Sequence, residues 1–378
     1  MNSIDATEIS GIRTCGVRQP GQLWVKLYFR AGIRDQQFFE DDLAHLVEHL
    51  ALSPVVDHPV TLQGTTSLTM TEFEFSGEPK AVQEALSGFC ARVRALADGA
   101  CTGEELEREL RVLDHEGGGP GMPPALAEAL TQRFGMLGAG RSAVSSGRRD
   151  QLDTNDVSRW TRQFFTQSNC AIGFVGPLPD DLSIDLPPGD PAALPIDRSC
   201  LSEFPAEFLS EGATTVSWLT PASLGNRAIK ESLLFGLIDD RLSRLRQEEG
   251  TLYGVAPSSV LVSDGSTVLV LELQCSPEAS AQVARAVIDN LHELRAEGVG
   301  EEEFERVRAS MTRSFAMMTP FDEVDLVVSW HIMGEPGATE FLDQAYEPLT
   351  HHDFNELLQG LDDSLLVGLV AGSEVSET

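Results

Sequence analysis

The sequence has 378 residues, of which 42% are hydrophobic and 23% charged, proportions typical of a globular protein of about two domains. Its formal net charge of -32 argues against a nucleic-acid-binding protein, because phosphates would be repelled. No apolar run is long enough for a membrane span, and the N-terminus lacks the basic and apolar regions of a signal peptide. Six cysteines without C-x-x-C spacing indicate reduced thiols. We therefore expect a cytoplasmic protein without nucleic-acid or membrane partners.

The first part of the chain predicts a strand, a helix and a second strand. Residues 23–32 alternate and are rich in aromatic and β-branched side chains, which is typical of a strand. The helix that follows is expected to carry acids in its first turn, where negative charge meets the positive end of the helix dipole. These acids are Glu40, Asp41 and Asp42. Residues 66–75 alternate again and predict the second strand.

The helix between these strands contains the pattern H-x-x-E-H, formed by His45, Glu48 and His49. Residues three and four apart share one face of a helix, so both imidazoles and the carboxylate leave the same side. The pattern is the inverse of the H-E-x-x-H zinc helix and is known as the inverzincin signature. Two imidazoles and a carboxylate suit a catalytic zinc, which keeps one position open for water. The alternative is an ordinary helix with two surface histidines.

Two further helices are expected at residues 81–96 and from Thr102 to Glu116. Glu109 and Glu116 lie seven residues apart on the second of them and therefore share a face. Glu116 can be a third metal ligand, and Glu109 an acid that orients a ligand histidine. Taken alone, each is more simply explained as a solvated glutamate of an acid-rich helix.

The second half of the sequence repeats the order of the first. A shift of 198 residues aligns the strand at 73–75 with residues 271–273, and the helix start at 105–108 with residues 303–306. The second half contains no H-x-x-E-H pattern. The sequence thus predicts a duplicated α+β protein, in which each domain is a mostly antiparallel sheet packed with helices.

A Pro- and Asp-rich stretch marks the expected division between the two copies. We place an N-terminal catalytic zinc-binding domain at 1–185, a Pro-rich linker at 186–205 and a homologous metal-free domain at 206–378.

Together these features resemble the pitrilysin/insulinase family of zinc peptidases, in particular the half-length processing-peptidase type. The resemblance covers nearly the whole chain and includes Arg30-Ala31-Gly32-Ile33-Arg34-Asp35 before the H-x-x-E-H helix. It implies the processing-peptidase/LuxS-like metallohydrolase fold, Zn²⁺ as cofactor, and hydrolysis of peptides or of a precursor peptide by a metalloendopeptidase. The implied zinc ligands are His45, His49 and Glu116. Glu48 is the implied general base on a zinc-bound water, with Glu109 as its supporting acid.

The same resemblance implies substrate contacts. Residues 243–255 are similar to a family stretch in which an arginine and a tyrosine seven apart bind the substrate carbonyl, and Arg246 and Tyr253 are the matching positions. Without the resemblance they would be a helix-end arginine and a core tyrosine. Ser67 and Leu68 occupy the positions where the family has Asn-Ala on the edge strand that pairs with the substrate.

The family closes two half-rings into a chamber, and one chain here corresponds to one half-ring. Because the chain carries both the metal motif and the Arg/Tyr pair, we expect a homodimer, with a heterodimer with a related chain as the second choice. Two other functions remain open at this point: a non-catalytic or partner-dependent subunit of a heterodimeric peptidase, and a binding module with a structural zinc.

Overall fold

The structure is a computed structural model that describes most of the chain. The described residues are 4–53, 59–116, 122–136, 138–143, 148–193, 197–220, 227–244, 246–247, 250–262, 267–332, 350–359, 361 and 364–370. They form an α+β protein with two sheets, which confirms the predicted fold class. Among these residues, no helix combines the length and the hydrophobicity that crossing a membrane requires.

The described residues divide into two compact units, each built from several segments of the chain. The first unit lies within Met1–Gly121, Ser145–Ala193 and Met318–Gln344, and the second within Met122–Val144, Leu194–Met317 and Ala345–Thr378. One boundary, between Ala193 and Leu194, falls inside the Pro-rich segment. The first half of the sequence contributes the segment Met122–Val144 to the second unit. The second half contributes the segment Met318–Gln344 to the first unit.

The first unit contains a six-stranded sheet with the order β1-β2-β6-β3-β5-β4. Its strands are β1 (Asp5–Ile9), β2 (Ile12–Val17), β3 (Leu23–Phe29), β4 (Thr61–Thr66), β5 (Thr71–Gly77) and β6 (Cys170–Val175). The β2–β6 pair is parallel and the other pairs are antiparallel. Strand β3 is central and β4 is an edge strand, so one side of β4 is without a strand neighbour among the described residues.

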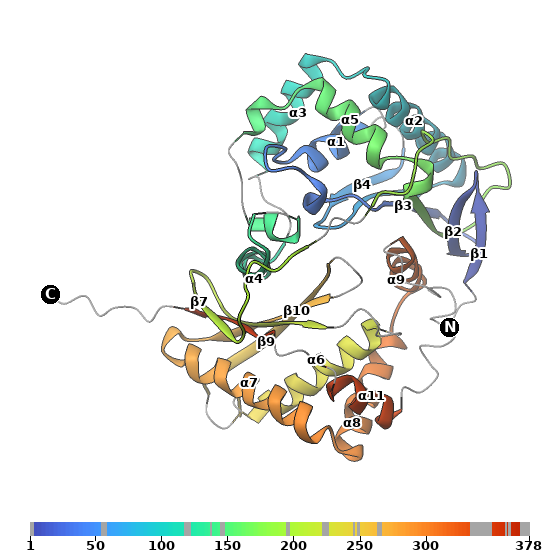
Figure 1. The fold of residues 1–378 in the computed structure, drawn as a ribbon. Coiled ribbons are helices and arrows are strands. Elements are labelled where there is room, and N and C mark those ends of the chain that lie inside the picture. Colours follow the sequence, from blue (N-terminus) through green and yellow to red (C-terminus); the bar gives the residue numbers. More distant parts are fainter. Residues whose placement is uncertain are drawn as a thin grey trace. The chain divides into compact units, whose positions relative to one another are not determined.

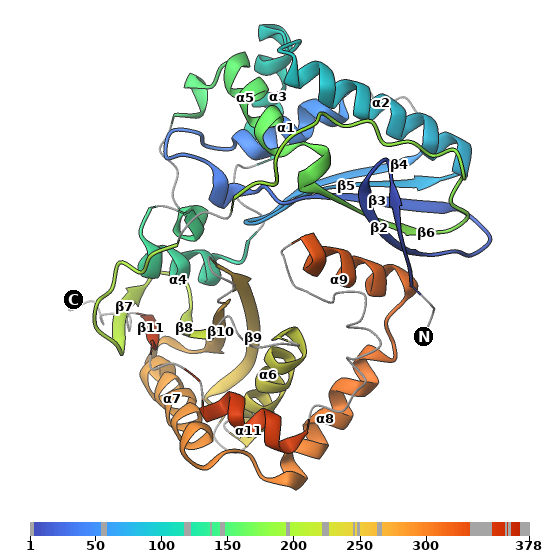
Figure 2. The same cartoon turned by 45° about the vertical axis from the view of Figure 1, so that its right-hand side comes forward.

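Helices cover both faces of this sheet (Figures 1 and 2). On one face lie α1 (Leu43–Leu52), α2 (Pro79–Ala97), α3 (Gly103–His115) and α5 (Thr154–Phe164). Alternate residues of β3, such as Val25 and Leu27, point into the core that these helices share. On the other face α9 (Pro320–Ile332) packs against β6, β2 and β3, and its Asp325 accepts a hydrogen bond from Tyr28 Oη at 2.7 Å.

The second unit contains a five-stranded sheet with the order β7-β11-β8-β10-β9. Its strands are β7 (Ala206–Ser210), β8 (Thr214–Thr220), β9 (Leu252–Leu261), β10 (Thr267–Cys275) and β11 (Leu366–Val370). Its helices are α4 (Pro124–Phe134), α6 (Arg227–Arg244), α7 (Ser280–Glu297), α8 (Glu301–Phe315) and α11 (His351–Gln359). Helix α4 comes from the first half of the chain, and its buried Arg133 donates a 2.7 Å hydrogen bond to the carbonyl of Ser364.

Short 3-10 helices occur in both units. They are η1 (Ile33–Asp35), η2 (Gly138–Ala143), η3 (Arg149–Gln151), η4 (Gln167–Asn169) and η7 (Pro277–Ala279).

Two local predictions are wrong. The acids expected in the first turn of the H-x-x-E-H helix precede it, because α1 begins at Leu43 and its N-cap Asp42 has a left-handed backbone with φ of 60°. The strand expected at 66–75 is interrupted, because β4 ends at Thr66, Ser67 and Met70 close a turn, and β5 begins only at Thr71. The Ser67 N–H donates to the Met70 carbonyl at 2.8 Å, and the Met70 N–H donates to Ser67 Oγ at 3.1 Å.

Candidate metal centre

Helix α1 presents a polar face with two histidines. Its apolar face, which includes Leu46 and Leu50, is fully buried in the core of the first unit. This burial fixes the rotation of the helix, so that His45 and His49 lie together on the opposite side with ring centroids 4.7 Å apart. Their side chains are 31% and 15% exposed, which leaves them accessible to an ion.

Helix α3 supplies two carboxylates to the same place. A capping box starts the helix: Thr102 Oγ1 accepts from the Glu105 N–H at 3.2 Å, and the Thr102 N–H donates to Glu105 Oε2 at 2.9 Å. The buried Leu113 anchors the far end of the helix. Glu109 therefore projects from the middle of α3 towards α1, and Glu116 projects from its C-cap.

The two histidines and Glu116 converge on one point. Nε2 of His45 lies 3.6 Å from Glu116 Oε2, and Nε2 of His49 lies 3.5 Å from the same oxygen. One potential ligand atom from each residue lies within 4.8 Å of the others. Ligands at the usual zinc distances in a tetrahedral site are separated by roughly 3.4 Å, so this arrangement fits a zinc ion. Two imidazoles and one carboxylate leave a fourth position open.

The charge state of His45 also suits a ligand. Burial lowers the pKa of His45, and the neighbouring His49 lowers it further, although Glu116 acts in the opposite direction. The neutral imidazole, which is the form that binds a metal, is therefore favoured at neutral pH.

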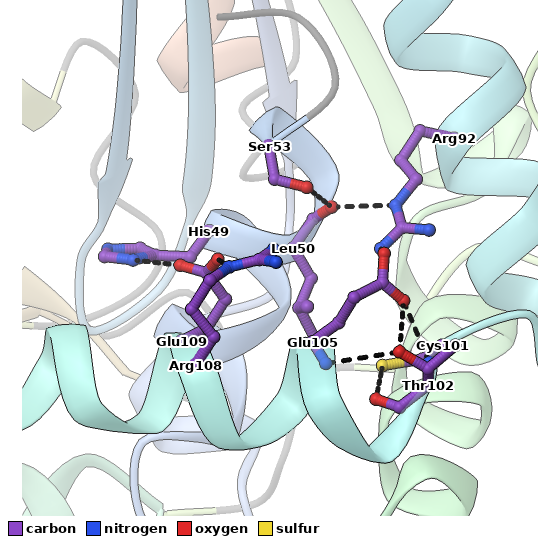
Figure 3. A network of polar contacts seen from close by, with 9 residues as sticks. All are labelled: His49, Leu50, Ser53, Arg92, Cys101, Thr102, Glu105, Arg108 and Glu109. Carbon is purple, nitrogen blue, oxygen red and sulfur yellow. Dashed lines mark hydrogen bonds and ion pairs between the residues drawn. The ribbon is translucent and has the colours of Figure 1, made fainter.

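Glu109 lies behind His49. Its Oε2 is 3.5 Å from His49 Nδ1, while its Oε1 accepts a 2.9 Å hydrogen bond from Arg108 Nε. Figure 3 shows the carboxylate between these two partners. A carboxylate at Nδ1 holds the imidazole so that Nε2 remains free for the metal, which is a common arrangement around ligand histidines.

Glu48 is buried beside the candidate ligands, with 4% of its surface exposed. Burial raises the pKa of Glu48 to about 7, and the hydrogen bond from Thr66 Oγ1 to Glu48 Oε2, 3.0 Å long, acts in the opposite direction. A metal ion beside the carboxylate would also favour its charged form. A carboxylate with a pKa near 7 can both take up and release a proton.

Two residues that contact Glu48 are not among the sequence-predicted site residues. Thr66 donates the hydrogen bond, and Gly64 gives the carboxylate room, because a Cβ at Gly64 would overlap Glu48 Oε1 and lie 2.6 Å from its Cδ. Both lie on β4 (Thr61–Thr66). Because the predicted strand begins only at residue 66, the prediction does not place the two residues on one strand. A prediction of the strand at its actual position would have indicated Gly64, because a glycine inside a strand often marks a place where another group approaches the backbone closely.

The predicted substrate-binding residues fall into different places. Ser67 and Leu68 lie in the turn after β4, and their carbonyls accept hydrogen bonds from the backbone of Ile33 and Arg34 at 3.1 and 3.0 Å. The open edge itself is β4. Arg246 and Tyr253 lie in the second unit, and Tyr253 is 70% exposed on β9, so it is not a core tyrosine.

Comparisons with known proteins concern the fold and one segment of the sequence. Residues 200–311 match the family model described as Peptidase M16 inactive domain. No curated protein matches the chain. The fold is similar to a chain of complex III from Candida albicans, with a TM-score of 0.78 and 12% identity, covering 96% of this chain and 95% of that one.

Two peptidase structures are similar over nearly all of this chain. One is a putative M16-like peptidase from Alicyclobacillus acidocaldarius, with a TM-score of 0.72 and 16% identity, covering 97% of this chain and 98% of that one. The other is pitrilysin, with a TM-score of 0.75 and 15% identity, covering 99% of this chain and 47% of that one.

These matches confirm the resemblance to the pitrilysin/insulinase family. M16 is the name of this peptidase family in the matched descriptions. The chain has the fold of the M16 peptidase structures and spans about half the length of pitrilysin, and its residues 200–311 match the model of the family's inactive domain. The candidate metal ligands and both other glutamates lie on α1 and α3, outside the matched residues.

Proposed function

We propose that the chain is a zinc-dependent endopeptidase that hydrolyses peptides or processes a precursor peptide. The observation that carries this proposal is the convergence of His45, His49 and Glu116, within 4.8 Å of one another, beside the buried carboxylate of Glu48. A structural zinc site usually has four protein ligands, whereas this arrangement has three and an adjacent acid, as catalytic zinc sites do.

Different residues would bind the metal, orient a ligand and transfer a proton. His45, His49 and Glu116 would hold the ion, and Glu109 would keep the ring of His49 in place through Nδ1. When bound, zinc would activate a water molecule and polarise the scissile carbonyl. Glu48 takes up a proton at its carboxylate and releases it to the leaving amine, and Thr66 orients that carboxylate through Oε2.

The peptide would bind as an added strand along β4. This strand is at the edge of the sheet and carries Gly64 and Thr66, which both contact Glu48. Backbone hydrogen bonds to an edge strand give affinity with little dependence on the side chains of the peptide. Arg246 and Tyr253, both exposed on the second unit, would bind a substrate carbonyl, as the family resemblance implies.

We propose that two half-length chains assemble, as a homodimer or with a related chain. The alternative function is a non-catalytic or partner-dependent subunit of such an assembly. It is favoured by the description of the matched model as an inactive domain and by the similarity to a chain of complex III. We also propose a cytoplasmic location, since none of the six cysteines, all of them described, forms a disulfide.

The direct test is the Glu48→Gln variant. The wild-type protein should contain zinc and cut members of a peptide mixture, as measured by mass spectrometry, whereas Glu48→Gln should retain zinc and lose hydrolysis by a factor of at least 100. Glu84→Gln, an exposed acid on α2, is the matched control and should behave as wild type.

The outcome decides between the two functions. The subunit function would be established instead by two results together. The zinc-loaded wild-type protein would cut no peptide by itself, and the Glu48→Gln variant would still support cleavage by a co-purified related chain.

A further inference from the structure

Helices α1 and α3, which carry all the candidate ligands, run in opposite directions and are joined by an arginine at each end. At one end, Arg92 donates from Nε to the carbonyl of Leu50 and from Nη2 to Glu105 Oε1, both at 3.0 Å (Figure 3). These groups belong to the end of α1 and the start of α3.

At the other end, Arg149 joins the start of α1 to the end of α3. Its Nη1 donates to Asp114 Oδ1 at 2.6 Å, and its Nη2 donates to Asp42 Oδ2. Asp42 is the N-cap of α1, and Asp114 lies in the last turn of α3, two residues before Glu116. Arg149 itself lies on η3, a separate segment of the same unit.

We propose that Arg149 is a positioning residue that holds the last turn of α3 against the start of α1 and thereby fixes Glu116 beside His45 and His49. This inference rests on the proposed metal site. It adds a residue that is hydrogen-bonded to Asp42 and Asp114 and that, through them, decides whether the third ligand is in place.

The last turn of α3 needs such a contact. Glu116 is the C-cap residue and its side chain is 47% exposed, so packing alone does not fix it. Terminal turns of helices open more readily than helix interiors, because their last carbonyls lack helical partners. The buried Leu113 anchors the backbone one residue before Asp114, and Arg149 adds a second point of attachment between Leu113 and Glu116.

The chemistry of arginine suits this task. Its planar fork reaches two carboxylates at once, which the single ammonium of a lysine does less well. The side chains of Arg149 and Asp42 are 22% and 28% exposed, so their ion pair is less screened than a pair on an open surface, whereas the Asp114 side chain is 64% exposed. Asp42 and Asp114 also offset its positive charge, which would otherwise oppose the binding of a cation nearby.

The test measures zinc affinity and local opening separately. Arg149→Gln should weaken zinc binding about tenfold in a competition assay with a chelating dye, and Arg149→Lys should weaken it less. In the metal-free protein, Arg149→Gln should speed amide hydrogen exchange at residues 112–116. Arg94→Gln, which removes an exposed 2.5 Å ion pair with Asp185 elsewhere in the unit, is the matched control and should change neither.

A double-variant cycle tells positioning from general destabilisation. Asp114→Asn should weaken zinc binding by a similar factor, and adding Arg149→Gln to it should weaken binding little further. Additive losses, or unchanged exchange at residues 112–116 in Arg149→Gln, would overturn the inference. If the wild-type protein bound no zinc, the proposed metal site would fail, while the exchange measurement would still decide whether Arg149 holds the end of α3.

Discussion

At the scale of single residues, the site depends on how closely side chains surround Glu48 and His49. Glu48 lies against the backbone of β4 at Gly64, and His49 lies between Glu109 and Glu116. Each of these contacts constrains one atom that the proposed chemistry needs: the proton-accepting oxygen of Glu48, or Nε2 of His49. Substitutions of the supporting residues should therefore change metal affinity and turnover separately.

Gly64→Ala tests the space beside Glu48. The new methyl group would overlap the carboxylate and lie 2.8 Å from Leu52 Cδ1, so Glu48 must rotate away. We expect kcat to fall by roughly 10- to 100-fold while zinc content stays at the wild-type level, because proton transfer depends on a well-placed carboxylate. Gly103→Ala is the matched control, since a Cβ there meets nothing within 4 Å. An unchanged kcat in Gly64→Ala would show that Glu48 does not act from this position.

Glu109→Gln tests the support of His49. The amide keeps the size of the side chain but loses the charge that faces Nδ1, so the imidazole is held less firmly and is a weaker ligand. We expect zinc affinity to fall by about 10- to 100-fold in a chelator competition assay. Glu107→Gln, an exposed acid on the same helix, should leave it unchanged. Equal affinities in the two variants would remove Glu109 from the site.

At the scale of elements, the sequence predicts the two helices that carry the candidate ligands well and the edge strand β4 poorly. The spacing of His45, His49, Glu109 and Glu116 is a local property, because residues on one helix keep a fixed angular relation. The strand at 66–75 is wrong because Ser67 and Met70 close a turn through both backbone and side-chain bonds, and alternation of side chains continues across that turn.

The contacts between elements could not be predicted from the spacing of residues along the sequence. Arg149 and Asp114 are 35 residues apart, and Gly64 meets Glu48 only because β4 pairs with β5 below α1. The exchange of α4 and α9 between the two units is equally hidden, since neither helix sequence indicates which of the two sheets it packs against. Long-range packing decides these features, and a single sequence does not reveal it.

Removal of the metal should leave the elements of the first unit folded. The core that packs α1 and α3 is apolar and does not pass through the candidate ligands, and Arg92 and Arg149 join both ends of the two helices. We expect a chelator to abolish hydrolysis without changing the far-ultraviolet circular dichroism, and added zinc to restore hydrolysis. Zinc at a hundred times its Kd should stabilise the fold by about 2.7 kcal/mol. Unfolding on chelation would support a structural metal instead.

At the scale of the whole molecule, the chain has the M16 fold and spans about half the length of pitrilysin. The candidate metal ligands lie in its first unit, and Arg246 and Tyr253 lie in its second. If two copies assemble, one chain could supply the Arg/Tyr pair to the metal centre of the other. Mixing two inactive variants tests this arrangement.

Glu48→Gln and Arg246→Ala each disable a different part of the proposed site. If the pair acts across a homodimer interface, a mixed dimer contains one site with an intact Glu48 from one chain and an intact Arg246 from the other. Random exchange of subunits makes half of the dimers mixed, so the mixture should recover roughly a quarter of wild-type activity. If the pair acts within one chain, the mixture should show no more than the average activity of the two variants, because every chain then carries a defect in its own site.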